Sequence, residues 1–517
     1  MLKRLLLLIW ITLLAGCAVN PVTGKKELML ISESQEFAIG REQYVPAQQS
    51  QGGRYVADPN VAVYVRQVGM KLAKVSDRPD LPYEFVVLNN SVPNAWALPS
   101  GKIAINRGLL VELQNEAQLA AVLAHEIVHA AARHSAKRLQ QNLLISASLA
   151  GLGIALDDND LRDILVGGAG LGAGLALAKY SRDHESESDH YGILYMVRAG
   201  YDPQAAVELQ RLFVRLSSAR QSDWLQGLFA SHPPSEERVR ANQALVDKLG
   251  NPGGFRGEAE YKRAMKHLLA TREAYKRYDT GMKLLRQKAW QAALDKARSA
   301  QVLEKNEALF YQLEAEALIG LGRKEAALRA YDKAISLNPE YFALYLGRAE
   351  LLRSLGRDAE AREDYEKANR WLPTSVAHLA LADMALKSGD RRAALEHYKI
   401  AAQASGETGK QARQKLQVLE AGQQPGRYLK LETFTNTRGE QFVVLRNTGP
   451  VAYRQVLVRL ELMNASGKVI ANERLLFESA IAPGGRSPVS RSRVADQAAR
   501  IPGTRMAMTI LQADVVE

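Results

Sequence analysis

The sequence predicts a multidomain protein in which an α+β domain is followed by an all-α repeat solenoid and a small β-sandwich. Strand and helix patterns mix in the first half, a 34-residue period occupies residues 275–419, and turn residues separate alternating strands near the end. The expected segments are a signal at residues 1–16, the α+β domain at 17–255, the solenoid at 256–421 and the β-sandwich at 427–517.

Residues 1–16 combine a basic start, a ten-residue apolar run and small residues before Cys17. Ten apolar residues fall short of the ~20 that a membrane-spanning helix needs, so this segment predicts a secretory signal. It resembles a bacterial lipoprotein signal, whose cleavage leaves Cys17 as the lipidated first residue, and Ala18 then implies outer-membrane delivery. The alternative is an ordinary cleaved signal. Cys17 is the only cysteine, so no internal disulfide can form.

Three short apolar segments, residues 83–88, 95–98 and 102–105, predict strands, with a turn at Pro99 to Gly101. We expect them to form a small antiparallel sheet beside the helix that follows. An edge strand of this sheet could hold an extended peptide by backbone pairing. The residues of that edge are Asn94, Ala95, Trp96 and Ala97.

The helical pattern of residues 115–141 contains the sequence His-Glu-Ile-Val-His at 125–129. His125 and His129 are four apart and share one helix face, so both imidazoles can reach one metal ion. Glu126 lies beside them, where it can act on a water molecule. The motif predicts a hydrolytic zinc site, which needs a third protein ligand and one open position.

The third ligand is predicted in residues 180–192. The metzincin pattern is excluded, because it needs glycine and histidine where this chain has Ala132 and Ser135. Glu185 can bind the metal instead, and Asp189, one helical turn later, can accept a hydrogen bond from the far nitrogen of a ligating histidine. The alternative is a solvated acidic helix face.

The remaining polar residues near these motifs receive more modest predictions. Glu187 points roughly 200 degrees away from Glu185 on a helix and is predicted to be a poor ligand. His134, His184 and His190 are expected to pack, form salt bridges or face solvent.

His232 precedes Pro233 and Pro234, which stop a helix and fix a loop. A histidine on a rigid loop could occupy the fourth zinc position, stabilise the transition state, or be a plain turn residue.

Residues 143–178 are rich in glycine, alanine and leucine but are interrupted by an acidic stretch at 157–160. Each apolar half is too short to span a bilayer. We therefore expect a buried or lid-like helical hairpin over the site, with membrane contact as the alternative.

The 34-residue period is the pattern of tetratricopeptide repeats, in which small alanines allow close helix packing and glycine makes the turn. About four helix pairs would form a concave surface that binds extended peptide or another protein. The residues that recur 34 positions later are Gly322, Ala327, Tyr331, Ala334 and Pro339.

Beyond a predicted linker at residues 422–426, the β-sandwich shows no chemistry, and a binding or spacer module is expected. The net charge of +12 favours acidic partners such as membrane head groups. Without any zinc-knuckle, RNA-binding or helix-turn-helix pattern, no nucleic-acid partner is expected.

Taken together, these motifs resemble the M48 family of zinc metallopeptidases, in its bacterial lipoprotein branch with tetratricopeptide repeats. The resemblance covers residues 17–420 and implies a zincin-like metalloprotease domain with one Zn²⁺ per chain. It also implies a role for each site residue. The chain departs from the family at Ser188, where the family usually has alanine before the aspartate. The zinc ligands would be His125, His129 and Glu185, the general base Glu126, the supporting carboxylate Asp189 and the latent-state zinc cap His232. The motifs that carry it are residues 17–24, 93–99, 125–129, 185–189 and 231–233.

The resemblance further implies a periplasmic endopeptidase, anchored in the outer membrane through a lipid on Cys17. Its substrates would be misfolded or stalled envelope proteins, and its repeats would engage the outer-membrane protein assembly machinery. The alternative is a repeat-based chaperone or adaptor with a largely latent peptidase.

Overall fold

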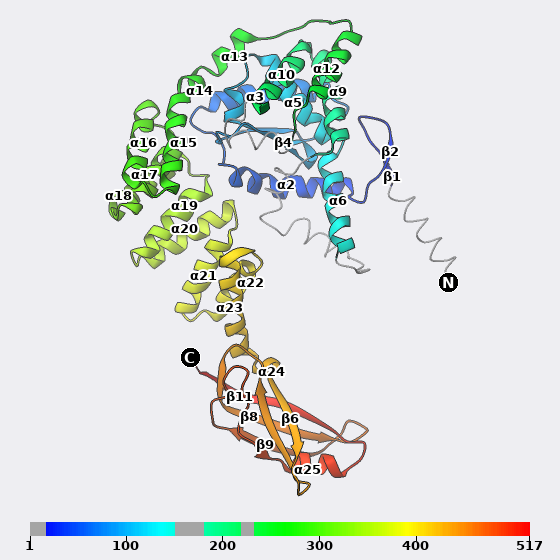
Figure 1. Cartoon of the computed structure of the whole chain (residues 1–517), viewed down its shortest axis with the longest axis vertical. Coiled ribbons are helices and arrows are strands. Elements are labelled where there is room, and N and C mark those ends of the chain that lie inside the picture. Colours follow the sequence, from blue (N-terminus) through cyan, green and yellow to red (C-terminus); the bar gives the residue numbers. More distant parts are fainter. Residues whose placement is uncertain (1–16, 150–179, 219–231, 517) are drawn as a thin grey trace, which may run out of the picture. The chain divides into compact units, whose positions relative to one another are not determined.

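A computed structural model describes residues 17–149, 180–218 and 232–516 of the chain (Figure 1). The chain divides into two units, Met1–Pro373 and Thr374–Glu517. The predicted signal and most of the predicted helical hairpin lie outside the described residues. Within the described part, no helix is both long and apolar enough to cross a membrane.

The first unit begins with an antiparallel hairpin of β1 (Cys17–Val19) and β2 (Lys26–Leu28), followed by helix α2 (Glu33–Ser50). Ser32 caps α2, because its hydroxyl accepts from the Gln35 backbone while the Gln35 side chain accepts from the Ser32 backbone. This capping box fixes where the chain leaves the hairpin and enters the helix.

The sheet of the first unit has the order β3-β5-β4 and is mixed. Strand β3 (Glu84–Leu88) runs parallel to β5 (Lys102–Asn106), and β4 (Ala95–Leu98) runs antiparallel to β5. The prediction of an antiparallel sheet was therefore wrong for one pair. In the hairpin of β4 and β5, it is β5 that lies beside β3. The chain reverses direction once between β3 and β4 and again between β4 and β5, so β3 and β5 run parallel.

Both faces of this sheet are covered by helices, because alternate strand residues are apolar on each face. Val87, Ala97 and Ile105 pack toward α3 (Pro59–Ala73) and α5 (Glu116–Ala131). Val86 and Trp96 instead pack toward α2 on the other face. Figure 1 shows β4 between α2 on one side and α3 and α5 on the other. The sheet thus fixes α5, the predicted metal-binding helix, against a rigid core.

The helical pattern predicted at residues 115–141 is two helices, α5 and α6 (His134–Leu149). Arg133 breaks them apart with a left-handed φ of 62°. Its side chain compensates by donating to Glu36 Oε1 at 2.7 Å and to the carbonyl of Ile31 at 2.9 Å. The chain can therefore turn directly after the metal-binding motif.

The remaining helices of the first unit surround α5 or begin the solenoid. They are α4 (Arg107–Leu110), α9 (Arg182–Arg198), α10 (Gln204–Ser218), α12 (Glu236–Lys248), α13 (Glu258–Ala264), α14 (Lys266–Ala270), α15 (Arg272–Arg286), α16 (Trp290–Leu303), α17 (Ala308–Gly320), α18 (Lys324–Leu337), α19 (Phe342–Ser354) and α20 (Asp358–Trp371), with a 3₁₀ turn at Pro99–Gly101.

The repeat prediction is confirmed as a series of helix pairs, and α21 (Ser375–Lys387) and α22 (Arg391–Ala402) form the last pair, in the second unit. The recurring alanines and tyrosines, such as Ala327 and Tyr331, are buried between helices. The recurring glycines end the first helix of each pair with a left-handed φ of 74° to 84°. Those glycines are Gly322, Gly356 and Gly389.

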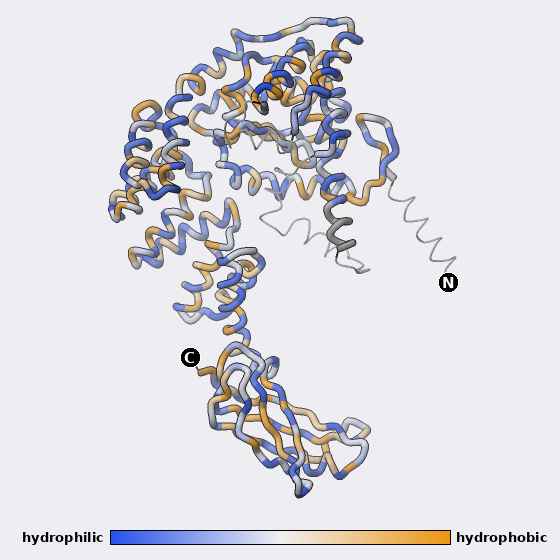
Figure 2. Tube along the Cα trace, viewed as in Figure 1, coloured by the Kyte–Doolittle hydropathy of each residue, from blue (hydrophilic) through white to orange (hydrophobic). Residues whose placement is uncertain are grey.

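The second unit continues with α23 (Gly406–Gln423) and α24 (Pro425–Tyr428), so the predicted linker is largely helical. The two sheets that follow, β10-β7-β6 and β11-β8-β9, form the predicted β-sandwich. Hydrophobic and hydrophilic residues alternate along its strands (Figure 2). Its elements are β6 (Leu429–Thr435), β7 (Gln441–Asn447), β8 (Ala452–Met463), β9 (Val469–Phe477), β10 (Ser490–Arg491), α25 (Arg493–Arg500) and β11 (Arg505–Val516).

Candidate metal centre

Helix α5 presents the two histidines of the motif toward a common point. Asn115 caps the helix by accepting from the Gln118 backbone, and almost every side chain of α5 is buried. The Nε2 atoms of His125 and His129 are 3.0 Å apart. The i, i+4 spacing thus produces the convergence that the sequence predicts.

Helix α9 brings Glu185 to the same point. Ser181 caps α9, and Gly192 allows it to pack closely on α5, because a Cβ there would lie 3.3 Å from the backbone nitrogen of His125. The carboxylate oxygens of Glu185 lie 3.5 Å from His125 Nε2 and 3.4 Å from His129 Nε2.

His232 completes a group of four. Its Nδ1 lies 3.3 Å from His125 Nε2 and 2.9 Å from Glu185 Oε1, and the ligand atoms of all four residues lie within 4.8 Å of one another. Donors held ~2.0–2.1 Å from a tetrahedral ion are separated by about 3.3 Å, so these spacings fit a metal ion. Three imidazoles and one carboxylate form a donor set that suits a divalent transition metal.

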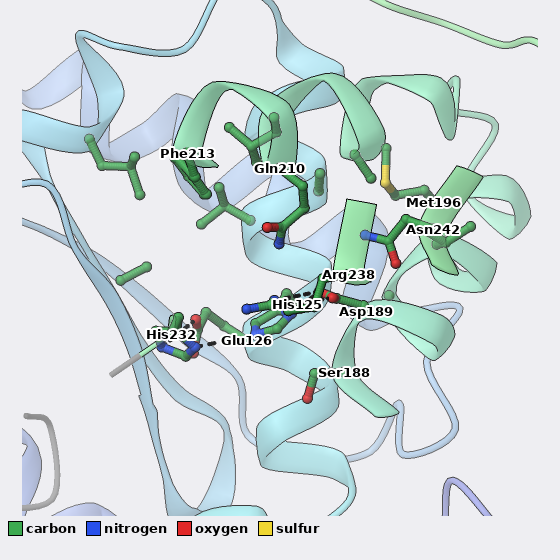
Figure 3. A pocket seen from close by; sticks show the side chains of 18 residues that line it. His125, Glu126, Ser188, Asp189, Met196, Gln210, Phe213, His232, Arg238 and Asn242 are labelled. Atoms are coloured by element: carbon green, nitrogen blue, oxygen red, sulfur yellow. Dashed lines mark hydrogen bonds and ion pairs between the residues drawn. The ribbon is translucent and has the colours of Figure 1, made fainter. Parts of the chain in front are cut away.

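Asp189 and Arg238 lie on the side of His125 that faces away from His232 (Figure 3). Asp189 Oδ1 lies 3.0 Å from His125 Nδ1, and Arg238 donates to both oxygens of Asp189 at 2.7 and 2.8 Å. Arg238 also contacts Glu185 Oε2 at 2.9 Å and donates to the carbonyl of Pro233 at 3.0 Å. One guanidinium therefore orients two carboxylates and the loop of His232.

The electrostatics of the site are dominated by burial and by these pairs. Burial would raise the pKa of Glu185, but the charges of His232 and His125 hold it well below its ordinary value. Burial would lower the pKa of His125, but Glu185 and Asp189 raise it to about 10. The pKa of His129 is lowered by burial, which favours the neutral ring that binds a metal.

Glu126 lies beside the group without a hydrogen-bond partner for its Oε2 among the described residues. Its Oε1 is 3.5 Å from His232 Nε2, and Figure 3 shows the two side chains facing each other. Burial raises the pKa of Glu126. A buried carboxyl with a raised pKa and a free oxygen has the properties of a general base.

The predicted substrate edge is strand β4, which is an edge strand of the sheet. The Ala97 carbonyl accepts hydrogen bonds from Ser135 Oγ at 2.8 Å and from the Tyr180 hydroxyl at 3.2 Å. The Tyr180 ring stacks on His129 with centroids 3.8 Å apart. Asn94, Ala95, Trp96 and Ala97 are all buried in this conformation.

A pocket opens beside His125 and Glu126, with about 570 Å³ of space including its open mouth (Figure 3). Its walls are mostly apolar and come from α5, α9 and α10. Such walls suit an apolar side chain of a bound peptide. The apolar lining includes Val122, Ile193, Met196, Leu209 and Phe213.

Sequence reasoning missed three residues that touch the ligand group, namely Arg238, Tyr180 and His134. His134 pairs with Glu187 at 3.2 Å, which was one of its expected contacts, but its Nδ1 also lies 3.0 Å from His129 Nδ1, which was not foreseen. Arg238 is one of two arginines in α12, with Arg240, and its sequence context carries no signal of its role.

The fold and the site define a metal-binding α+β domain of the His-Glu-x-x-His class, followed by tetratricopeptide repeats. Sequence comparison assigns it to a family: the model of peptidase family M48 matches residues 59–246, and the tetratricopeptide repeat model matches 308–341 and 342–374. The chain belongs to peptidase family M48.

Three relatives illustrate the similarity. The chain is 32% identical over 223 residues to the mitochondrial metalloendopeptidase OMA1 of Schizosaccharomyces pombe, covering 43% of this chain and 64% of that protein. It is 29% identical over 234 residues to the beta-barrel assembly-enhancing protease of Escherichia coli strain K12, covering 43% and 47%. It is 30% identical over 202 residues to the metalloprotease YcaL of the same strain, covering 37% and 74%. The matched region thus spans about half to two thirds of the first two relatives.

Proposed function

We propose that this chain is a zinc-dependent endopeptidase that handles misfolded or stalled proteins of the bacterial cell envelope. The single observation that carries the proposal is the convergence of His125, His129 and Glu185 beside Glu126, whose Oε2 has no hydrogen-bond partner among the described residues. The names of the relatives support a proteolytic role in the envelope.

In this proposal His125, His129 and Glu185 hold the zinc ion, which suits a site of nitrogen and oxygen ligands. Zinc, when bound, supplies Lewis acidity that activates water and polarises a peptide carbonyl. Glu126 takes the proton of the attacking water and returns it to the leaving amine. Asp189 keeps the His125 ring in position through the contact with its Nδ1.

His232 serves as a removable fourth ligand. Its Nδ1 faces the ligand group while its loop is held by Arg238. Hydrolysis needs an open position, so His232 must leave before substrate is cleaved. The same movement would free the space beside Glu126, which His232 Nε2 now faces.

Substrate enters as an extended segment paired with β4 along Asn94, Ala95, Trp96 and Ala97, with a side chain in the adjacent apolar pocket. The proposed division is a protease domain at 17–255, repeats at 256–421 that engage protein partners such as the assembly machinery, and a sandwich at 427–517. A lipid on Cys17 anchors the chain on the periplasmic side of the outer membrane.

The test is cleavage of an unfolded protein by residues 18–517, beside Glu126→Gln, with zinc quantified in both. Cleavage by the parent alone, with about one zinc in each protein, supports the peptidase and its base. Equal cleavage by both proteins, or a parent that binds no zinc, overturns the proposal.

A second candidate is a repeat-based adaptor with a mostly latent peptidase. The observation that favours it is that a ligand atom of His232 lies within 4.8 Å of those of His125, His129 and Glu185, close enough to serve as a fourth ligand. The substitution Glu126→Gln in cells distinguishes the two candidates. An adaptor would keep its function in cells after this substitution, whereas a peptidase would lose it.

A further inference from the structure

A chain of side chains runs from the metal centre to the N-terminal hairpin. His129 Nδ1, on the far side of the ring from the ligand group, lies 3.0 Å from His134 Nδ1. His134 Nε2 lies 3.2 Å from Glu187 Oε1, and the Asn20 amide nitrogen donates to the same oxygen at 3.2 Å. His134 is fully buried and Asn20 is 2% exposed, so water competes little for these bonds.

The donors and acceptors of this chain fix where each proton sits. A carboxylate only accepts, so His134 Nε2 must carry a hydrogen and donate it to Glu187. In the neutral ring Nδ1 is then an acceptor, and His129 Nδ1–H donates to it. His129 Nε2 is consequently left with a free lone pair, directed toward the ligand group. Ser188 Oγ, 3.4 Å from His134 Nδ1, can add a second donor to the same atom.

The turn after Cys17 is built to aim Asn20. The Asn20 side-chain oxygen accepts from the backbone of Val22 at 2.9 Å and Thr23 at 3.3 Å, which leaves its amide group to point outward. Gly24 closes the turn with a φ of 71°, and its nitrogen donates to the Asn20 carbonyl at 2.9 Å. The sequence Asn-Pro-Val-Thr-Gly at 20–24 thus presents one amide to Glu187 and to Glu27.

We propose that Asn20, Glu187 and His134 form a positioning relay that holds His129 in the metal-binding tautomer. The inference rests on the proposed zinc site and assigns a role to the 20–24 turn, which the peptidase mechanism does not use. Asp189 does the same for His125 directly, whereas His129 depends on two further residues and a segment more than 100 positions earlier. Docking of the N-terminal hairpin is therefore coupled to metal retention.

The relay predicts which substitutions release the metal. Glu187→Gln keeps the shape of the side chain but removes its charge, and we expect about tenfold faster zinc loss to a chelator, in the range typical of residues that support metal ligands. Asn20→Asp keeps the acceptor that builds the turn but faces Glu187 with a like charge, so it should act in the same direction. Glu27→Gln is the matched control, because it removes the charge of the other partner of Asn20, which also pairs with Lys137, but leaves the contacts among Glu187, His134 and His129 in place.

The experiment uses the full chain in detergent, loaded with zinc or with Co²⁺. Rates of zinc loss and the Co²⁺ absorption spectrum report the ligand geometry, and thermal unfolding of the metal-free proteins reports the fold. We expect Glu187→Gln to lose zinc faster and to shift the Co²⁺ spectrum, with an unfolding temperature close to that of the parent and with Glu27→Gln unchanged. Zinc retention and spectra equal to the parent in Glu187→Gln would overturn the relay.

The double variant Asn20→Asp with Glu187→Gln tests the link to the hairpin. The introduced amide can donate to the carboxylate introduced at position 20 while its oxygen still accepts from His134. Zinc loss should therefore be slower than the product of the two single effects predicts. Strictly additive effects would show that Asn20 does not act through Glu187.

None of these measurements uses cleavage, so a parent that holds zinc but cuts nothing would refute the peptidase and leave the relay standing.

Discussion

The metal centre and the C-terminal sandwich each contain a buried polar side chain, Glu126 and Asn447, whose hydrogen bonding differs. In the sandwich, Asn447 is fully buried and its amide donates to the carbonyls of Val451 at 2.7 Å and Ile481 at 2.9 Å, while its oxygen accepts from Gly449 at 2.8 Å. At the metal centre, Glu126 Oε2 and His232 Nε2 have no hydrogen-bond partner among the described residues.

A buried polar group without a partner costs free energy, so an unpaired carboxylate oxygen beside a metal-ligand group is consistent with the proposed role of Glu126. Asn447 completes its bonds inside the protein, whereas Glu126 keeps an oxygen free for a reactant. The comparison predicts that substitutions at the two places will fail in different ways.

The largest effect is expected for Glu126→Gln. Loss of the general base should lower the cleavage rate by about 10²- to 10⁴-fold. Because Oε2 has no hydrogen-bond partner and a glutamine oxygen can keep the 3.5 Å contact of Oε1 with His232, zinc content and unfolding temperature should stay near those of the parent. Cleavage assays and calorimetry on the same preparations check this. A large drop in unfolding temperature would show that Glu126, like Asn447, stabilises the fold.

Asn447→Ala should do the reverse and destabilise the second unit by about 2 kcal/mol, because two buried carbonyls lose a donor. All five tryptophans, at positions 10, 96, 224, 290 and 371, precede the second unit. Urea unfolding followed by circular dichroism should therefore shift, while tryptophan fluorescence and cleavage should not. An equal shift in both signals would contradict the prediction that the substitution destabilises the second unit alone.

His232→Ala should raise cleavage of an unfolded substrate about tenfold. This is the factor expected if the fourth metal position is free of His232 in only about a tenth of the parent molecules. Zinc should remain bound through His125, His129 and Glu185. Initial rates at equal zinc content test the prediction. Unchanged or lower activity would mean that His232 assists catalysis and does not hold the site latent.

The smallest effect is expected for Gly389→Ala in the last repeat. Gly389 has a φ of 84°, a conformation that costs other residues about 1 kcal/mol. Gly422→Ala is the matched control in the same unit, because its added Cβ would make only an ordinary contact, 3.5 Å from Val515. The urea midpoint of the second unit should fall for the first variant and not for the second.

Local spacing made much of the fold and part of the site predictable. The His125 and His129 pair follows from helix periodicity, and the fixed 34-residue period predicted the helix pairs of the solenoid. Long-range placement was not encoded in this way. The parallel pairing of β3 with β5 depends on which strand becomes the neighbour, and the break at Arg133 occurs at a residue that ordinarily continues a helix.

The support around the ligands was the hardest part to predict. Arg238 is 49 positions from Asp189, and nothing in the spacing of its helix marks it as different from other arginines. Glu187 was predicted from its helix face to be a poor ligand, but its contact with His134 depends on the turn at Arg133. Both roles arise from tertiary packing.

If substrate pairs with β4 as proposed, the stacking of Tyr180 on His129 and its bond to the Ala97 carbonyl set a minimum length for the peptides that bind. A peptide strand that pairs with β4 at Ala97 must exchange one hydrogen bond for another, so that contact alone provides little net affinity. Only a chain long enough to make further backbone bonds gains from the exchange. Extended, unfolded segments would therefore outcompete short peptides, and folded proteins with no free strand would be spared.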